Sequence, residues 1–485
     1  MALMAISERE VMDRLRFDNP WWQAGRTVEA EFRSAPRRAY FPAFHAQVSQ
    51  LEVHRSVLLM GPRRVGKTWM MLQCIDQLMQ EGVSGSQILF ASLETPIYTG
   101  LSLEAILKLF LRMHPQEPKF VFFDEIQYLP DWERHLKSLT DSYRKFRFVG
   151  SGSAAAALRR KSQESGAGRF TDFLLPPLSF AEYLRFAGRE ADLVHEVPPK
   201  DVHHAAARHW ECPDIWQLNR EFVRYLNLGG FPEAVMTPAV GNEAGRYIRQ
   251  DIIEKVLLRD LPSLYGIQDV QELNRLFNVL AYNSGNEVNL ESLSRESSVT
   301  KITLSRYLDY LEAAFLIRRI DRVDQDFGSF QRATRFKVYL TNPTMRAALF
   351  GPMDESSPAM GAMAETAVFC QWLHSSTWID RLRYARWRDR EVDMVGLDPQ
   401  GQGPASLVEV KWSDHPLEHG GDLKGLLELA AKRPLSRPPL VTTLTRSETR
   451  RFGDLEIEFI PTSLHCYTIS RNLQEPRPTP KPAAG

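Results

Sequence analysis

A glycine-rich loop in the first part of the chain carries the residue types that bind phosphate. The loop fits the pattern G-x-x-x-x-G-K-[ST] completely, with Gly61, Pro62, Arg63, Arg64, Val65, Gly66, Lys67 and Thr68 in sequence. An apolar run precedes it and a helical pattern follows it, which is the context that this motif requires. We expect the loop N–H groups and Lys67 to contact the phosphates of ATP and the Thr68 hydroxyl to bind Mg²⁺. The alternative is a glycine turn that is followed by a lysine by chance. A complete motif makes this alternative a minor one.

Two acids end the apolar run of residues 120–123. We expect Asp124 to hold Mg²⁺ and Glu125 to orient or deprotonate the attacking water. The next apolar run, residues 146–149, leads into a Gly-Ser-Gly-Ser segment that contains Ser151 and Ser153. Ser151 could contact the γ-phosphate or the water, but Gly and Ser are also ordinary loop residues. Both interpretations of Ser151 stay open.

Residues 390–395 and 406–412 predict two adjacent strands joined by a turn. A period of two places Glu409 and Lys411 on one face of the second strand. With Asp393 on the first strand, this set resembles the site of PD-(D/E)XK nucleases. The resemblance implies that Asp393 and Glu409 bind Mg²⁺ or Mn²⁺, that Lys411 positions or activates water, and that Glu365 on a preceding helix is a further metal ligand. The alternative is a solvated strand pair, and Val392 stands where many of these nucleases have proline.

Arginines immediately precede the metal set. Alternation predicts that Arg386, Arg388 and Arg390 share one strand face, where they would contact nucleic-acid phosphates. The alternative is a charged edge strand that resists aggregation.

Further motifs resemble the AAA-type ATPases of bacteria and archaea. They are residues 61–68, 123–127, 150–153, 168–169, 177–180, 229–233 and 259–261, so the resemblance covers nearly the whole chain. It identifies Arg169 as a candidate for contacting the γ-phosphate of its own or a neighbouring subunit, and it is compatible with a homo-oligomer. An arginine in a flexible Gly/Ser loop is the alternative.

The alternation of apolar runs and helical patterns in residues 50–148 predicts an α/β fold with a parallel sheet. We expect six parts. They are a lead segment (1–34), an AAA-type P-loop domain (35–190), a helical connector (191–260), a winged helix-turn-helix (261–335), a PD-(D/E)XK nuclease-like α/β domain (336–472) and a disordered Pro-rich tail (473–485).

The predicted winged helix has a second helix that could enter a major groove. Lys301 and Arg306 face outward on it, whereas Asp309 and Glu312 on the same helix would repel phosphate. A packing module without bound DNA is the alternative.

The composition of the chain gives no electrostatic signal for a partner. Lys+Arg and Asp+Glu both number 60, so binding to nucleic acid must depend on a local patch. The four cysteines form no C-x-x-C pair, and the sequence offers neither a signal peptide nor an apolar run long enough for a membrane span. We therefore expect a cytoplasmic protein without a membrane partner.

The sequence thus predicts ATP binding and hydrolysis in the first half of the chain. The ATPase module would control a metal-dependent nuclease-like domain that acts on nucleic acid, with DNA favoured, as in genome defence or mobile-element systems. One alternative is a regulatory switch in which an inactive nuclease fold binds DNA or a protein partner. Another is an assembly ATPase.

Overall fold

The chain folds as two compact units, Met1–Pro176 and Pro177–Gly485. The computed structural model describes residues 7–115, 120–152, 168–198, 208–324, 335–401, 403–433, 435 and 437–474. Ser153 and residues 475–485 of the predicted tail lie outside these ranges. Within the part of the chain that the structure describes, every helix falls short of the length or the apolar content that a membrane span needs.

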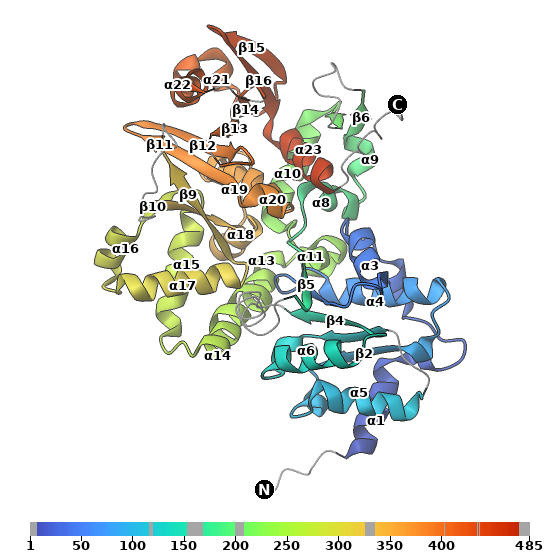
Figure 1. The fold of residues 1–485 in the computed structure, drawn as a ribbon. Coiled ribbons are helices and arrows are strands. Elements are labelled where there is room, and N and C mark those ends of the chain that lie inside the picture. Colours follow the sequence, from blue (N-terminus) through green and yellow to red (C-terminus); the bar gives the residue numbers. More distant parts are fainter. Residues whose placement is uncertain are drawn as a thin grey trace. The chain divides into compact units, whose positions relative to one another are not determined.

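A parallel five-stranded sheet forms the centre of the first unit (Figure 1). Its order is β2 (Ile88–Ser92), β3 (Phe120–Asp124), β4 (Arg147–Gly152), β1 (Ser56–Met60) and β5 (Phe170–Leu174). All neighbouring strands are parallel. The predicted α/β fold with a parallel sheet is confirmed. Strand β1 is the apolar run before the phosphate loop, and β3 and β4 lie at the apolar runs of residues 120–123 and 146–149.

Helices cover both faces of this sheet. They are α1 (Glu8–Asp18), α2 (Ala30–Ser34), α3 (Phe41–Ser49), α4 (Lys67–Gln80), α5 (Leu103–Met113) and α6 (Trp132–Ser142). Helices α3 and α4 lie on one face, and α1, α5 and α6 lie on the other (Figure 1). The parallel strands are therefore buried on both faces, as their uninterrupted apolar sequences require.

The lead segment before the sheet is packed against the edge strand β2. The Asn19 side chain accepts a hydrogen bond from Phe90 N at 2.7 Å and donates one to Phe90 O at 2.8 Å, and Trp22 Nε1 donates to Ile88 O at 2.8 Å. These contacts use backbone groups that an edge strand otherwise leaves open. The lead segment is thus part of the first unit.

The second unit begins with short helices and a small hairpin. These elements are α8 (Phe180–Phe186), α9 (Glu190–Leu193), β6 (His195–Val197), β7 (His209–Glu211), α10 (Ile215–Leu228), α11 (Pro232–Met236), α12 (Pro238–Gly241), α13 (Ala244–Tyr247), the π-helical η6 (Ile248–Glu254) and η7 (Val256–Asp260), and α14 (Leu261–Tyr265). Phe180 and Tyr183 of α8 are buried in the same core cluster as Phe222 of α10. The units therefore divide at Pro176, whereas the sequence placed a boundary after residue 190.

A nine-stranded sheet dominates the rest of the second unit (Figure 1). Its order is β15 (Glu448–Phe452), β16 (Leu455–Pro461), β14 (Leu440–Thr443), β13 (Pro404–Glu409), β12 (Arg390–Leu397), β11 (Leu382–Trp387), β9 (Ile317–Val323), β10 (Arg335–Leu340) and β8 (Glu287–Asn289). Strands from both sides of the boundary expected near residue 335 therefore share one sheet. Among the residues that the structure describes, β9 and β11 are joined through the pairs Tyr384–Arg322 and Ala385–Val323.

Helices accompany this sheet, and two separate hydrophobic clusters pack against its strands. The helices are α15 (Val270–Tyr282), α16 (Leu290–Ser297), α17 (Lys301–Ala313), α18 (Thr344–Phe350), α19 (Met360–Trp372), α20 (Ser376–Ile379), α21 (His415–Glu418), α22 (Lys424–Lys432) and α23 (Thr462–Gln474). Val408 and Val410 belong to a core cluster with α19 and α23. Leu407 belongs to a second cluster with α22. The alternation expected for this strand is thus present.

The arginines before the predicted metal set do not share one strand face. Trp387 of β11 pairs with Arg390 of β12, and Arg388 and Asp389 form the connection between the two strands. Arg388 has a φ of 51°, in the left-handed region that turns use. The prediction of one face for Arg386, Arg388 and Arg390 is wrong because the chain reverses between them.

Candidate functional site

The phosphate loop begins where β1 ends and closes at the N-terminus of α4. A Cβ on Gly61 would lie 2.2 Å from the carbonyl oxygen of Leu175, so no larger residue fits without moving the backbone. Gly66 caps α4 with a φ of 93°, a conformation that glycine adopts without strain. The structure therefore explains why glycine is needed at both positions of the motif. The loop N–H groups lie at a helix N-terminus, where anions bind.

Arg38 supports this loop from within the first unit. Its Nη1 donates to Val65 O at 2.8 Å and its Nη2 donates to Pro176 O at 2.9 Å, and the residue is buried. The sequence analysis missed Arg38, because a single arginine in a short basic segment forms no recognisable pattern. Its guanidinium holds one carbonyl of the phosphate loop and the last residue of the unit in fixed relation.

Lys67 is buried beside the loop that it follows. Its Nζ donates to Pro62 O at 2.8 Å and to Gly61 O at 3.1 Å. The ammonium group is therefore held next to the loop backbone, where the motif requires a positive charge for phosphate.

Strand order brings Asp124, Ser151 and Thr68 together. Strand β4 lies between β3 and β1, so the carboxyl end of β4 separates Asp124 from the phosphate loop. Thr68 Oγ1 donates to Asp124 Oδ2 at 2.8 Å, and the Ser151 hydroxyl donates to the other carboxylate oxygen. Burial, with the charge of Glu125 as the second cause, raises the pKa of Asp124 to about 6. A carboxylate and a hydroxyl at this spacing are oxygen donors that suit Mg²⁺, so these residues fit the metal.

Glu125 follows Asp124 in a conformation that turns its side chain away from the strand. Its φ is 52°, its N donates to Ser151 Oγ at 3.0 Å, and its carboxylate accepts a hydrogen bond from Gln127 Nε2. Ser151 thus contacts both acids, which an ordinary loop serine would not do. The sequence analysis gave no role to Gln127, although it lies two residues after the acid that it contacts.

Arg169 lies at the other edge of the sheet. Phe170 pairs with Ser56, the first residue of β1, and the Arg169 carbonyl accepts a hydrogen bond from Ser56 N at 2.9 Å. Its guanidinium forms an ion pair with Asp141 at 2.5 Å. The phosphate loop follows the last residue of β1, about 13 Å further along the strand at about 3.3 Å per residue. This placement argues against contact with the γ-phosphate of its own subunit, and contact with a neighbouring subunit stays a prediction.

A second polar cluster lies in the nine-stranded sheet, where Asp393, Glu409 and Lys411 converge. Asp393 Oδ2 accepts a hydrogen bond from Val410 N at 2.9 Å, which ties the two strands together at the acids. Lys411 Nζ donates to Glu409 Oε1 at 2.6 Å. Burial, followed by the charge of Asp393, raises the pKa of Glu409 to about 8.

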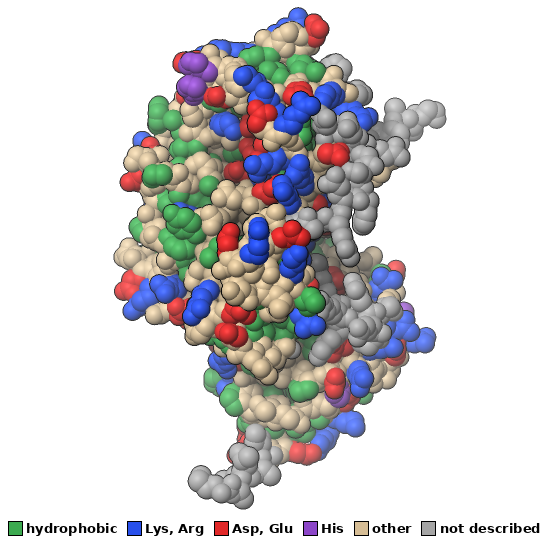
Figure 2. Space-filling view, turned by 90° about the vertical axis from the view of Figure 1, so that its left-hand side faces the viewer, with side chains coloured by type: hydrophobic (Ala, Val, Ile, Leu, Met, Phe, Trp, Pro, Cys, Tyr) green, Lys and Arg blue, Asp and Glu red, His purple; other side chains and the backbone are tan. Residues whose placement is uncertain are grey.

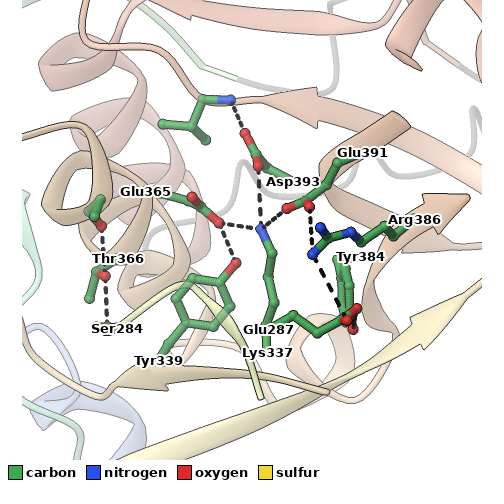
Figure 3. A network of polar contacts seen from close by, with 12 residues as sticks. Ser284, Glu287, Lys337, Tyr339, Glu365, Thr366, Tyr384, Arg386, Glu391 and Asp393 are labelled. Carbon is green, nitrogen blue, oxygen red and sulfur yellow. Dashed lines mark hydrogen bonds and ion pairs between the residues drawn. The ribbon is translucent and has the colours of Figure 1, made fainter. Parts of the chain in front are cut away.

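Glu365 of α19 completes the predicted set. Its Oε1 accepts hydrogen bonds from Tyr339 OH at 2.6 Å and from Lys337 Nζ at 2.8 Å (Figure 3). Burial, followed by the charge of Asp393, raises the pKa of Glu365 to about 7. The structure therefore brings all four predicted residues into one cluster. It also adds Lys337 and Tyr339, which the sequence analysis missed because they lie on β10, more than 50 residues before Asp393.

The cluster does not fit the divalent ion that the nuclease resemblance implies. Among the described residues, no three His, Cys, Asp or Glu side chains are arranged so that they could hold a metal ion. The Lys337 ammonium lies instead between the carboxylates of Glu365, Glu391 and Asp393 (Figure 3). The expected binding of Mg²⁺ or Mn²⁺ by Glu365, Asp393 and Glu409 is not supported by this geometry.

Comparisons with known proteins agree with the first site. A family model described as an AAA domain matches residues 53–184, and a model described as a domain of unknown function (DUF8612) matches residues 219–356. An uncharacterised protein of Haemophilus influenzae is 25% identical over 346 residues, which cover 70% of this chain and 78% of that protein. An uncharacterised protein of Methanocaldococcus jannaschii is 22% identical over 346 residues, or 70% of this chain and 71% of its own length.

The comparison with solved structures matches the ORC2 protein of Aeropyrum pernix in ADPNP and ADP complexes. It is 13% identical, covers 68% of this chain and 95% of its own, and has a TM-score of 0.37. Residues 53–184 of this chain form an AAA-type P-loop ATPase domain.

Proposed function

We propose that the first unit binds ATP with Mg²⁺ and hydrolyses it. The observation that supports this most is the hydrogen bond of 2.8 Å between Thr68 Oγ1 and Asp124 Oδ2. It joins two residues 56 positions apart that the same chemistry requires, one from the phosphate loop and one from β3. Both residues lie beside the buried Lys67, so the side chains expected to bind Mg²⁺ and phosphate come together in one place.

Each residue of the site has a separate task in this proposal. The loop N–H groups and Lys67 bind the phosphates, and Thr68 and Asp124 hold Mg²⁺, which neutralises charge on the phosphate oxygens. Glu125 takes the proton of the attacking water, while Gln127 and Ser151 hold the segment that carries Glu125 in place. Ser151 is thus a positioning residue for both acids.

Metal removal tests this function directly. We expect the purified chain to release phosphate from ATP in Mg²⁺ and to lose that activity in EDTA, because Asp124 and Thr68 act on the phosphates only through the ion. Activity should return when Mg²⁺ is added in excess of the chelator. Equal phosphate release with and without a divalent ion would contradict the proposed roles of Thr68 and Asp124.

Nucleic-acid binding by the second unit is a second candidate function. Helices α16 and α17 are joined by a turn at Ser298, which has a φ of 60°, and are followed by β9 and β10. We infer that these elements act as a winged-helix module, with DNA favoured as its ligand. Asp309 and Glu312 support this, because both hold Arg319, at 2.7 and 2.5 Å. Their charges are therefore balanced locally, which weakens the repulsion of phosphate expected from the sequence.

Exposed basic residues of α17 would contact the nucleic acid. Arg306 is exposed, and Lys301 is exposed and forms an ion pair with Glu291 at 2.7 Å. On the face drawn in Figure 2, Lys and Arg are interspersed with Asp and Glu, so a local contact fits the neutral chain better than a long-range field.

Replacing Arg306 tests this candidate. We expect Arg306→Ala to weaken binding of a fluorescent DNA duplex several-fold and to lower the slope of log affinity against log salt by about one. Lys108→Ala, which removes one exposed charge from α5 of the first unit, should change neither quantity. An unaltered salt slope for Arg306→Ala would exclude phosphate contact by Arg306.

A further inference from the structure

Lys337 is a buried cation in the centre of an acidic cluster. Its side chain is 2% exposed, and its Nζ lies 2.6 Å from Glu391 Oε1, 2.8 Å from Glu365 Oε1 and 3.3 Å from Asp393 Oδ1. These carboxylates come from α19 and from alternate residues of β12, while Lys337 comes from β10. Figure 3 shows the ammonium group pointing between the three acids.

The surrounding contacts hold these acids around the ammonium group. Tyr339 OH donates to the same Glu365 oxygen as Lys337, and Val410 N donates to the second oxygen of Asp393. Arg386 Nη1 lies 3.5 Å from Glu391 Oε2. Each acid is therefore held by Lys337 and by one further donor, and the three acids face a common point that Lys337 fills.

Glu409 is the remaining acid of the cluster. Lys411 holds its Oε1 at 2.6 Å, while its buried Oε2 has no hydrogen-bond partner among the described residues. Burial, followed by the negative charge of Asp393, raises the pKa of Glu409. The four acids of the cluster are thus held by three cations, Lys337, Lys411 and Arg386, and removing one cation leaves acids that must gain protons or another cation.

We propose that the Lys337 ammonium takes the cation position of this cluster, so that the second unit keeps the carboxylates of a metal-dependent nuclease but binds no divalent ion there. The proposal does not depend on ATP hydrolysis by the first unit or on DNA binding by α17. Two cations cannot share the position, because an ammonium nitrogen and a Mg²⁺ or Mn²⁺ ion would each need the same carboxylate oxygens. A lysine there also removes the metal-bound water on which such hydrolysis depends.

Removing Lys337 should convert the cluster into a metal site. Without the ammonium, buried carboxylates would lie together uncompensated, which is costly unless they gain protons or another cation. A divalent ion can supply that charge, with Glu409 Oε2 available as a further oxygen ligand. Lys337→Met has a similar length and no charge, so it is the variant that leaves the position open.

The experiment measures Mn²⁺ binding by electron paramagnetic resonance with the full chain in the absence of nucleotide. Every protein carries Asp124→Asn, so that the first unit does not contribute its own metal ligand. We expect the background protein and Lys337→Arg to show no Asp393-dependent Mn²⁺ site. Lys337→Met should bind Mn²⁺ about tenfold more tightly or better, and adding Asp393→Asn to it should abolish the gain.

Two results would overturn the proposal. One is a Mn²⁺ site in the background protein that disappears with Asp393→Asn, since Lys337 would then leave room for the ion. The other is a folded Lys337→Met protein, verified by circular dichroism, that gains no Mn²⁺ binding. If Lys337→Met does not fold, the background and Lys337→Arg proteins still decide the matter, because an Asp393-dependent site in either one contradicts the proposal and its absence from both supports it.

Discussion

Glu125→Gln should retain ATP and lose hydrolysis, with kcat falling by about 10²–10⁴-fold. In the proposed mechanism the substitution removes the group that accepts the proton of water but leaves Thr68 and Asp124, the proposed ligands of Mg²⁺, unchanged. The amide can still contact Gln127, so the segment after β3 should keep its conformation. Dissociation constants for ATP and single-turnover rates of phosphate release, measured on the same protein, separate binding from chemistry.

A matched acid in the same unit provides the control for Glu125. Glu94 accepts a hydrogen bond from Tyr128 OH at 3.1 Å and lies after the edge strand β2. We expect Glu94→Gln to hydrolyse ATP at the normal rate. If Glu125→Gln also turns ATP over near the normal rate, another residue positions the water and the role given to Glu125 is wrong.

Lys67→Ala should remove detectable ATP binding, a loss of about 100-fold or more in affinity, because the ammonium is the one side-chain charge that the motif directs at the phosphates. The substitution also removes two hydrogen bonds, to the carbonyl oxygens of Gly61 and Pro62. The fold should survive this loss, because neither bond joins separate elements of the sheet. Fluorescence of a nucleotide analogue and thermal unfolding of the same sample measure the two effects.

Lys108→Ala is the charge-matched control for Lys67→Ala. Lys108 is exposed on α5, so its loss should leave nucleotide affinity unchanged. Normal ATP affinity in Lys67→Ala would contradict the phosphate-loop assignment. A large fall in the unfolding temperature would instead show that the lysine supports the loop itself.

The nucleotide site was largely predictable because its chemistry is local in sequence. Eight consecutive residues from Gly61 to Thr68 contain the loop, the lysine and the hydroxyl proposed to bind Mg²⁺, and an apolar strand before Asp124 marks the second proposed ligand. A parallel sheet requires apolar runs separated by helices, so the sequence also predicted the alternation of strands and helices. The contribution of Arg38 was not predictable, because it reaches Val65 across 27 residues without a motif.

The acidic cluster shows the limits of the same reasoning. Period two correctly placed Glu409 and Lys411 on one face, and the predicted strands lie side by side. Sequence spacing did not reveal Lys337, which comes from a strand that lies three places from β12 in the sheet. Resemblance to a nuclease identified the acids, but it did not reveal that a distant lysine lies between three carboxylates.

The sequence by itself determined the residues that bind phosphate, the strands that carry the acids and the α/β class of the first unit, because each depends on neighbours a few positions apart. Only the tertiary structure decided at which end of a strand a residue lies and which charged side chains come into contact. It placed Arg169 at the amino end of β5, away from the phosphate loop, and it reversed the chain at Arg388. It also brought Lys337 between Glu365 and Asp393. Electrostatic interactions act through space, so charges that are distant along the chain determine what a site binds only after folding brings them together.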